Sequence, residues 1–79
     1  MTVNDPVNHP EHYTSHPSGI ECIEIVRHFG YNLGNAIKYI WRVGLKKDEA
    51  LSDIEKEIED INKAIFYLQD HLNTLEEKL

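Results

Sequence analysis

Apolar residues recur at helical spacing along most of the chain, most regularly in its C-terminal third. From Leu51 to Leu79 they alternate between spacings of three and four residues, with no proline or glycine between them. This heptad pattern is typical of a helix that packs along one continuous seam. It predicts a helix over about residues 50–77, with Ser52 and Glu55 as a capping box at its start. The seam consists of Leu51, Ile54, Ile58, Ile61, Ile65, Leu68, Leu72, Leu75 and Leu79.

The N-terminal part of the chain divides into an arm and a short helix. Residues 1–18 contain all three prolines, which predicts an irregular arm. Apolar residues at helical spacing then predict a helix over about 19–29. Ser18 and Glu21 have the spacing of a capping box at its start, and Gly30 is expected to end it.

The stretch from 32 to 44 predicts a second helix with two different faces, which Gly44 ends. The apolar face is expected to lie in the core and consists of Leu33, Ala36, Ile37, Ile40, Trp41 and Val43. The polar face consists of Asn35, Lys38, Tyr39 and Arg42. Two cations with an amide and a phenol suit a planar anion, because cations bind phosphate oxygens and a tyrosine ring can stack on a base. The alternative is a solvated face whose cations pair with acids elsewhere in the chain.

Length and periodicity together predict an all-α fold that assembles as a homo-oligomeric bundle. A chain of 79 residues forms one small domain, and a core of that size gives little stability on its own. A helix of about 28 residues is about 42 Å long. The two short helices cannot cover it, so the part from Ile61 to Leu79 is expected to pair with another copy.

Charge and composition exclude several classes of protein. Eight basic against 14 acidic residues give a net charge of −6, which argues against general nucleic-acid binding. The single cysteine, Cys22, allows no internal disulfide and no cysteine zinc cluster, in keeping with the cytoplasm. No apolar run of about 20 residues and no signal-peptide pattern occurs, so we expect a soluble protein without a membrane partner.

The arm and the acidic residues offer further chemistry. The three arm histidines, at 9, 12 and 16, have a spacing that invites a metal, but the prolines around them prevent a helix from aligning them. They are either ordinary exposed histidines or part of an arm that closes over a ligand. The groups that would then contact the ligand are Asn8, His9, His12 and Tyr13.

Two acidic pairs, Glu21 with Glu24 and Glu57 with Asp60, could hold Mg²⁺ if the helices brought them together. They could equally be the acidic residues that commonly occur near a helix N-terminus. No glycine-rich phosphate loop is present, so any phosphate chemistry must use side chains borne on helices.

Four segments in order resemble a known family: NHPEHYT at 8–14, GIECIE at 19–24, NLGNAIKYIWRVGLK at 32–46 and DINKAIFYL at 60–68. They are similar to the SaV-like family of small bacteriophage proteins, which is itself similar to a phage deoxynucleoside monophosphate kinase without a P-loop. The positions that match its motifs are Asn8, His9, His12, Tyr13, Glu21, Asn35, Lys38, Tyr39, Arg42, Lys46 and Lys63.

The resemblance implies a phage nucleotide-binding protein of the infected cell's cytoplasm, with phosphoryl transfer to a (deoxy)nucleoside monophosphate as its kinase-like activity. Phosphates would be held by Lys38, Arg42 and Lys46, and Tyr13, Tyr39 or Trp41 would stack on the base. The catalytic candidates are His9, His12 and Lys38.

Three alternatives remain open at this stage. One is a nucleotide sponge that sequesters a host signalling nucleotide without turnover. Another is a MazG-like nucleoside triphosphate pyrophosphatase that uses Mg²⁺ on the four acids Glu21, Glu24, Glu57 and Asp60. The third is a coiled-coil interaction protein.

Overall fold

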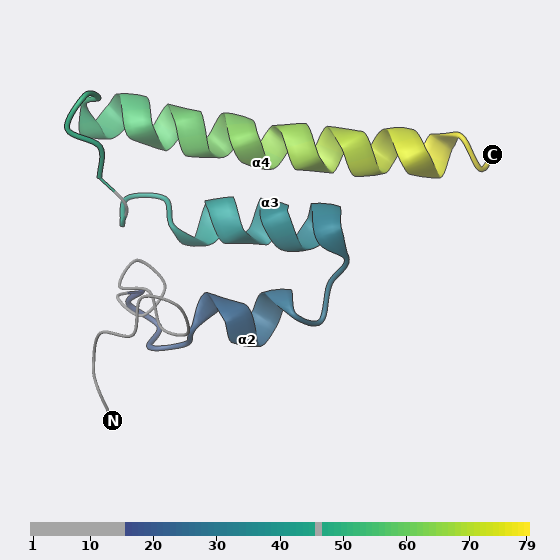
Figure 1. The fold of residues 1–79 in the computed structure, drawn as a ribbon, viewed down its shortest axis with the longest axis horizontal. Helices are drawn as coiled ribbons and strands as arrows, with labels where there is room; N and C mark the ends of the chain where they lie inside the picture. The colour runs from purple at the N-terminus through teal and green to yellow at the C-terminus, as the bar shows by residue number, and fades with distance from the viewer. Residues whose placement is uncertain (1–15, 46) are drawn as a thin grey trace.

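The computed structural model describes residues 16–45 and 47–79, which form three α-helices and no strand. Helix α2 spans Cys22–Val26, α3 spans Tyr31–Trp41 and α4 spans Asp53–Glu76. The helices lie in layers, with α3 between α2 and α4, and α4 continues past α3 toward the C-terminus (Figure 1). The predicted all-α class is therefore confirmed for the described part of the chain.

The long helix begins almost where the sequence predicts. Ser52 Oγ accepts a hydrogen bond from Glu55 N at 3.1 Å, and Glu55 Oε1 accepts one from Ser52 N at 3.0 Å. This reciprocal pair is the predicted capping box, and it satisfies backbone N–H groups that have no partner inside the helix. It fixes Asp53 as the first residue of α4.

The first helix is shorter than the predicted range of 19–29. The Ser18 hydroxyl accepts a hydrogen bond from Ile20 N at 3.1 Å and lies 2.7 Å from His16 Nδ1, so it caps a local turn instead of α2. After Val26 the backbone tightens, because Phe29 N donates to Val26 O three residues back. The predicted Ser18–Glu21 capping box is therefore wrong.

Two glycines frame α3 in different ways. Gly30 is its N-cap with φ −73° and does not end the preceding helix in the left-handed conformation that the sequence predicts. Gly44 has φ +79°, which favours glycine, and lies in the turn that leads out of α3. The helix itself already ends at Trp41 with Arg42 as its C-cap, so the predicted end at Gly44 is three residues too late.

Helices α3 and α4 pack through polar and small side chains. Lys56, Asp60 and Ala64 recur every four residues on α4 and are buried. Arg42 is buried against Asp60, whereas Ile40 of the predicted apolar stripe is 58% exposed. The expectation that the apolar stripe of α3 forms the core is therefore wrong at Ile40, and Arg42 of the predicted polar face is buried because an ion-pair network occupies the α3–α4 contact.

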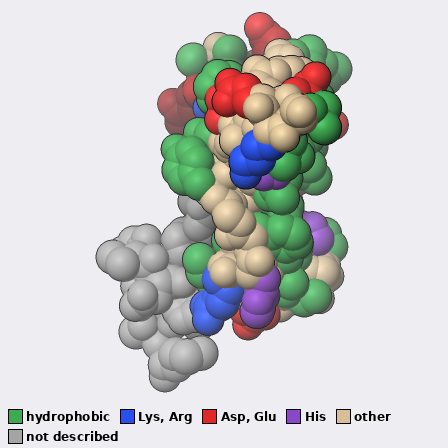
Figure 2. All heavy atoms as spheres, turned by 90° about the vertical axis from the view of Figure 1, so that its right-hand side faces the viewer, with side chains coloured by type: hydrophobic (Ala, Val, Ile, Leu, Met, Phe, Trp, Pro, Cys, Tyr) green, Lys and Arg blue, Asp and Glu red, His purple; other side chains and the backbone are tan. Residues whose placement is uncertain are grey.

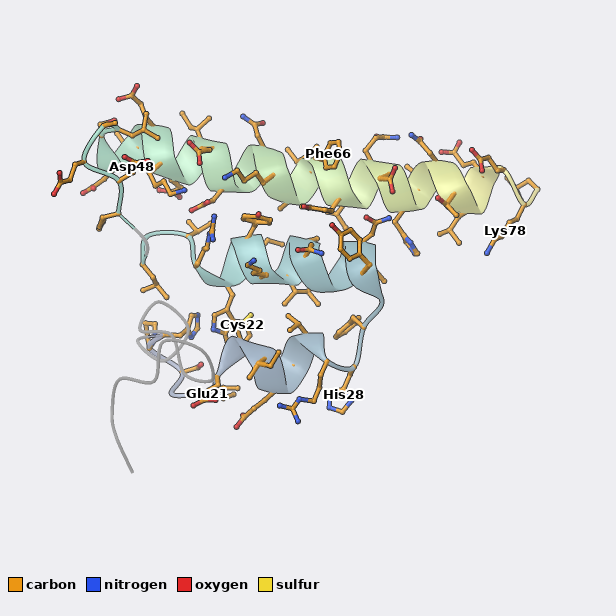
Figure 3. The ribbon with its side chains drawn as sticks, viewed as in Figure 1. Glu21, Cys22, His28, Asp48, Phe66 and Lys78 are labelled. Atoms are coloured by element: carbon orange, nitrogen blue, oxygen red, sulfur yellow. The ribbon has the colours of Figure 1, made fainter. Side chains whose placement is uncertain are left out.

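On its other side α3 packs against α2. A Cβ at Gly34 would lie 3.4 Å from Val26 O, so the two helices approach closely here. The buried Cys22 side chain lies between α2 and α3 (Figure 3). Small residues thus allow α3 to occupy the middle layer.

The heptad seam of α4 lies outside the contact with α3. From Ile54, at 72% exposure, to Leu75, at 47%, every seam residue of the helix is exposed. Hydrophobic side chains are visible at the surface around the C-terminal end of α4 (Figure 2). The two short helices therefore leave the seam exposed from Ile54 onward, whereas the sequence predicts this only for its C-terminal part.

None of the helices in residues 16–45 and 47–79 has the length and apolar character needed to cross a bilayer.

Candidate functional site

The centre of the α3–α4 contact is a buried ion-pair network. Asp60 Oδ1 accepts hydrogen bonds from Arg42 Nε at 3.3 Å, from Arg42 Nη2 at 3.2 Å and from Lys56 Nζ at 3.2 Å. The Asp60 side chain is 1% exposed and those of Arg42 and Lys56 are 6% exposed. Buried charges need such partners, because an unpaired one carries a large desolvation cost. This network therefore fixes the relative position of α3 and α4.

One carboxylate oxygen of the network is not satisfied. Among the described residues, Asp60 Oδ2 and Trp41 Nε1 are the buried side-chain polar atoms without a hydrogen-bond partner. The Trp41 ring lies beside His16, with 4.6 Å between ring centroids. Trp41 therefore packs against the segment that precedes α2, while its indole N–H stays unpaired.

Glu59 extends the network toward solvent. Its Oε1 accepts hydrogen bonds from Lys63 Nζ at 2.9 Å and from Lys56 Nζ at 3.0 Å. These two hydrogen bonds lower the pKa of Glu59 from 4.5 to about 2, and the bond from Lys63 has the larger effect. Burial opposes the charge on Lys56, but its bonds to Glu59 and Asp60 outweigh burial and raise its pKa. Both groups therefore stay charged at neutral pH.

Three cations surround the ring of Tyr39. The guanidinium carbon of Arg42 lies 4.4 Å from the ring centre, Lys63 Nζ lies at 5.4 Å and Lys38 Nζ at 5.5 Å. These are cation–π distances. The opposite helix contributes Tyr67, whose ring stacks on Tyr39 at 5.8 Å with 10° between the planes. Residues from both helices thus make one aromatic and cationic surface.

The aromatic surface continues toward the start of α3. The Tyr31 ring meets Tyr67 edge-on at 5.8 Å and is 76% exposed. The neighbouring Tyr31 hydroxyl, followed by burial and the charge of Tyr39, raises the pKa of Tyr67. Beside this row, Asn32 Nδ2 donates to Asp70 Oδ2 at 2.8 Å. The exposed Tyr31 face is the open end of the row.

The structure brings together part of the predicted ligand site. Lys38, Tyr39 and Arg42 gather as predicted, and Asn35 lies on the same helix, where its Nδ2 donates to Tyr31 O at 2.8 Å. Arg42, however, is paired with Asp60, which corresponds to the alternative in which cations of this face pair with acids. Trp41, also predicted to stack on the base, packs against His16 instead. The other predicted site residues lie outside the described residues: Asn8, His9, His12, Tyr13 and Lys46.

The four candidate acids for Mg²⁺ do not meet. Glu21 precedes α2, Glu24 lies on it, and both are separated by α3 from Glu57 and Asp60 of α4 (Figure 3). Within residues 16–45 and 47–79, no group of three or more His, Cys, Asp or Glu could hold a metal ion. The carboxylate of Asp60 is instead used by Arg42 and Lys56. The described residues thus give no support to the pyrophosphatase arrangement.

Several residues of the surface are not predicted from the sequence. Lys56, Glu59 and Tyr67 are absent from the predicted site, although Tyr67 belongs to the fourth family-like segment. The spacing of four between Glu59 and Lys63 is a signal for an ion pair on a helix. No comparable signal shows that Lys56 and Asp60 face α3, because that depends on how the helices pack.

The fold and this site define a small helical protein with a cationic, tyrosine-rich surface between its two longer helices. The chain belongs to the family DUF3310, described as proteins of unknown function, whose model matches residues 7–69. The match contains all four family-like segments. No curated protein and no solved structure matches the chain.

Proposed function

We propose that the protein binds a nucleotide at the cationic, tyrosine-rich surface between α3 and α4, here called the α3–α4 surface. The observation that supports the proposal is the set of three cations within 5.5 Å of the Tyr39 ring centre. A cationic surface beside aromatic rings is suited to an anion with a planar base.

The charge balance at the α3–α4 surface supports an anionic ligand. Four of the eight cations of the chain gather here: Lys38, Arg42, Lys56 and Lys63. Two acids, Glu59 and Asp60, pair with three of them. The α3–α4 surface therefore has an excess of positive charge, although the whole chain has a net charge of −6. A phosphate would neutralise this local excess.

The cations differ in how freely they can reach a ligand. The Lys63 side chain is 41% exposed and Lys38 is half-buried, so their ammonium groups are the ones that would hold phosphate. Arg42 would act as a positioning residue, because its guanidinium already binds Asp60 and covers Tyr39. The base would stack on Tyr31, since the ring of Tyr39 is already covered by Tyr67 and Arg42.

The arm belongs to the same proposal. Its groups at residues 8–13 would close over the bound nucleotide, so deleting residues 1–13 is expected to weaken binding. The proposal includes the cytoplasm of the infected host as the place of action, and its support is the family resemblance.

The test of the proposal is calorimetric titration with nucleoside mono-, di- and triphosphates. A charge-assisted contact is worth about 1.5–3 kcal/mol, so Lys38→Ala should weaken binding by roughly 10- to 100-fold. Lys47→Ala is the matched control, because Lys47 is exposed and pairs with Asp53 away from the α3–α4 surface. Equal nucleotide affinities of the two variants would contradict a binding site at the α3–α4 surface.

Chromatography of the nucleotide separates binding from turnover. A kinase converts a monophosphate and a triphosphate into diphosphates, whereas a sponge releases its nucleotide unchanged after heating. Both outcomes keep the nucleotide site and differ only in whether the bound nucleotide reacts.

We also propose that the chains assemble through α4. A continuous row of exposed apolar residues is unusual on a monomer, because such patches normally mark an interface. Light scattering at micromolar concentration tests this. A monomer that keeps its full helical content would contradict assembly, and capture of a different protein by α4 would favour the coiled-coil interaction alternative.

A further inference from the structure

We infer that α4 pairs with α4 of a second copy in an antiparallel direction, in the register that sets Ile58 opposite Leu75. This inference rests on the proposed assembly through α4 and adds the identity of the partner, the direction and the register. It follows from the residue types along the seam, from their charged neighbours and from the side of α4 that α3 leaves open.

The first argument is the size of the seam residues. Within α4 the seam positions are isoleucine up to Ile65 and leucine from Leu68 onward. In the antiparallel register every layer contains one of each. The layers are Ile58 with Leu75, Ile61 with Leu72, and Ile65 with Leu68, and Ile54 lies toward Leu79, which follows the end of α4. A parallel pair would instead stack isoleucine on isoleucine in one half and leucine on leucine in the other.

The heptad positions also disfavour a parallel pair. Two-stranded parallel coils prefer a β-branched residue at position a and leucine at position d. Here Ile54 and Ile61 occupy position d, and Leu72 occupies position a. Three of the seven seam positions of α4 thus depart from the parallel preference and four, Ile58, Ile65, Leu68 and Leu75, meet it, whereas an antiparallel pair sets an isoleucine against a leucine in each layer.

The second argument is charge. The acidic residues of α4 concentrate in its first turns, so a parallel pair would place two acidic segments side by side. In the antiparallel register Asn62 of one copy lies opposite Gln69 of the other, and Glu57 lies near Lys78, which belongs to the turn that follows α4. Glu55 meets Glu76, a like-charge contact, although the Glu55 carboxylate already accepts the hydrogen bond from Ser52 N.

The third argument is the geometry of the open side. The buried residues Lys56, Asp60 and Ala64 place α3 on one side of α4, whereas Phe66 points away from α3 (Figure 3). Beside the seam lies an open hollow of about 550 Å³. It is lined by Leu51, Glu55, Ile58, Glu59, Asn62, Lys63 and Phe66. A second α4 can therefore approach the seam without displacing α3, and the hollow borders this contact at Leu51 and Ile58.

The decisive experiment is a charge-reversal cycle in the full chain, read as the dimer dissociation constant by sedimentation. Glu57→Lys should weaken the dimer about tenfold, because it creates two like-charge contacts with Lys78. Lys78→Glu alone should weaken it similarly, and the double variant should restore the original constant. Additive effects of the two substitutions would overturn the register. Asp53→Lys is a control away from the seam flank and should not be rescued by Lys78→Glu.

Spin labels give the direction independently. A label on Glu77→Cys in a Cys22→Ala background should report a separation of roughly 30 Å between copies, from the 1.5 Å rise per residue. A parallel dimer would place the two labels side by side, which would overturn the direction but keep assembly through α4. A monomer by light scattering would overturn both, and none of these outcomes depends on nucleotide binding.

Discussion

The two sides of α4 show opposite solutions to the same problem of covering a helix. The side toward α3 buries charged and polar groups, among them Asp60 and Lys56, and each is held by a defined partner. The other side carries the longest apolar row of the chain and leaves it exposed. The charged side specifies one arrangement of α3, since hydrogen bonds are directional, whereas the apolar side can accept any surface of matching shape.

This difference indicates a division of labour within one helix. Ion pairs give geometry but little net stability, because desolvation offsets much of their attraction. Apolar burial gives stability, and the exposed seam of α4 can supply it only by contact with another molecule. We therefore expect stability to depend on protein concentration, as it does for proteins that fold and associate together.

The largest effect is expected from removing the anion of the charged side. Asp60→Ala leaves Arg42 and Lys56 buried without their shared carboxylate, and breaking a buried pair costs about 3–5 kcal/mol. Urea unfolding followed by circular dichroism measures this cost. Asp70→Ala is the matched control, because Asp70 is exposed and its carboxylate accepts a single hydrogen bond, from Asn32, within the described part of the chain. The control should change stability by about 0.5 kcal/mol or less. Equal costs for the two variants would contradict the proposed role of the network.

A smaller effect is expected on the apolar side. Ile65→Asp places a charge in the middle of the seam and removes the burial of an isoleucine, which is worth about 1.5–3 kcal/mol. The dimer should dissociate at concentrations about 100-fold higher than those of the native chain. Asn73→Asp, also exposed on α4 but off the seam, should leave the dimer intact. A dimer unaffected by Ile65→Asp would place the interface elsewhere.

The smallest effect concerns the rim of the charged side and depends on pH. Because the pKa of Glu59 falls to about 2 in the folded chain, its ion pairs stabilise the fold fully above its ordinary pKa of 4.5. This contribution is lost as the pH falls from 4.5 to about 2. The difference in thermal midpoint between the native chain and Glu59→Gln should therefore shrink over this window. The difference should be small, because solvent screens the partly exposed Glu59 side chain.

A difference that stays constant across that window would contradict the assignment to Glu59. The two midpoints should be measured at matched protein concentration, because association also changes the midpoint.

Local sequence signals predicted the parts of the fold that depend on neighbouring residues. The start of α4 follows from Ser52 and Glu55, and the turn after α3 contains Gly44 as predicted, although α3 itself ends earlier, at Trp41. The same reasoning failed at Ser18, where a closer partner, His16, takes the hydroxyl that was expected to cap α2.

The candidate site could be predicted only in part, because half of it depends on packing. Lys38, Tyr39 and Arg42 share one helix, so their spacing predicts that they gather. Their partners on α4 lie far along the chain, and periodicity cannot show which side of α4 faces them. Apolar periodicity pointed to the seam as the buried side, but the pairing of Arg42 with Asp60 turned the opposite side inward.

The position of Cys22 has a consequence for how the molecule can open. Its thiol is buried between α2 and α3, and burial raises its pKa although Lys38 opposes the shift, so the reactive thiolate is scarce. Since α2 is only five residues long, it is held by its contact with α3 more than by its own hydrogen bonds. We therefore expect the rate of alkylation of Cys22 to report how often α2 detaches from α3.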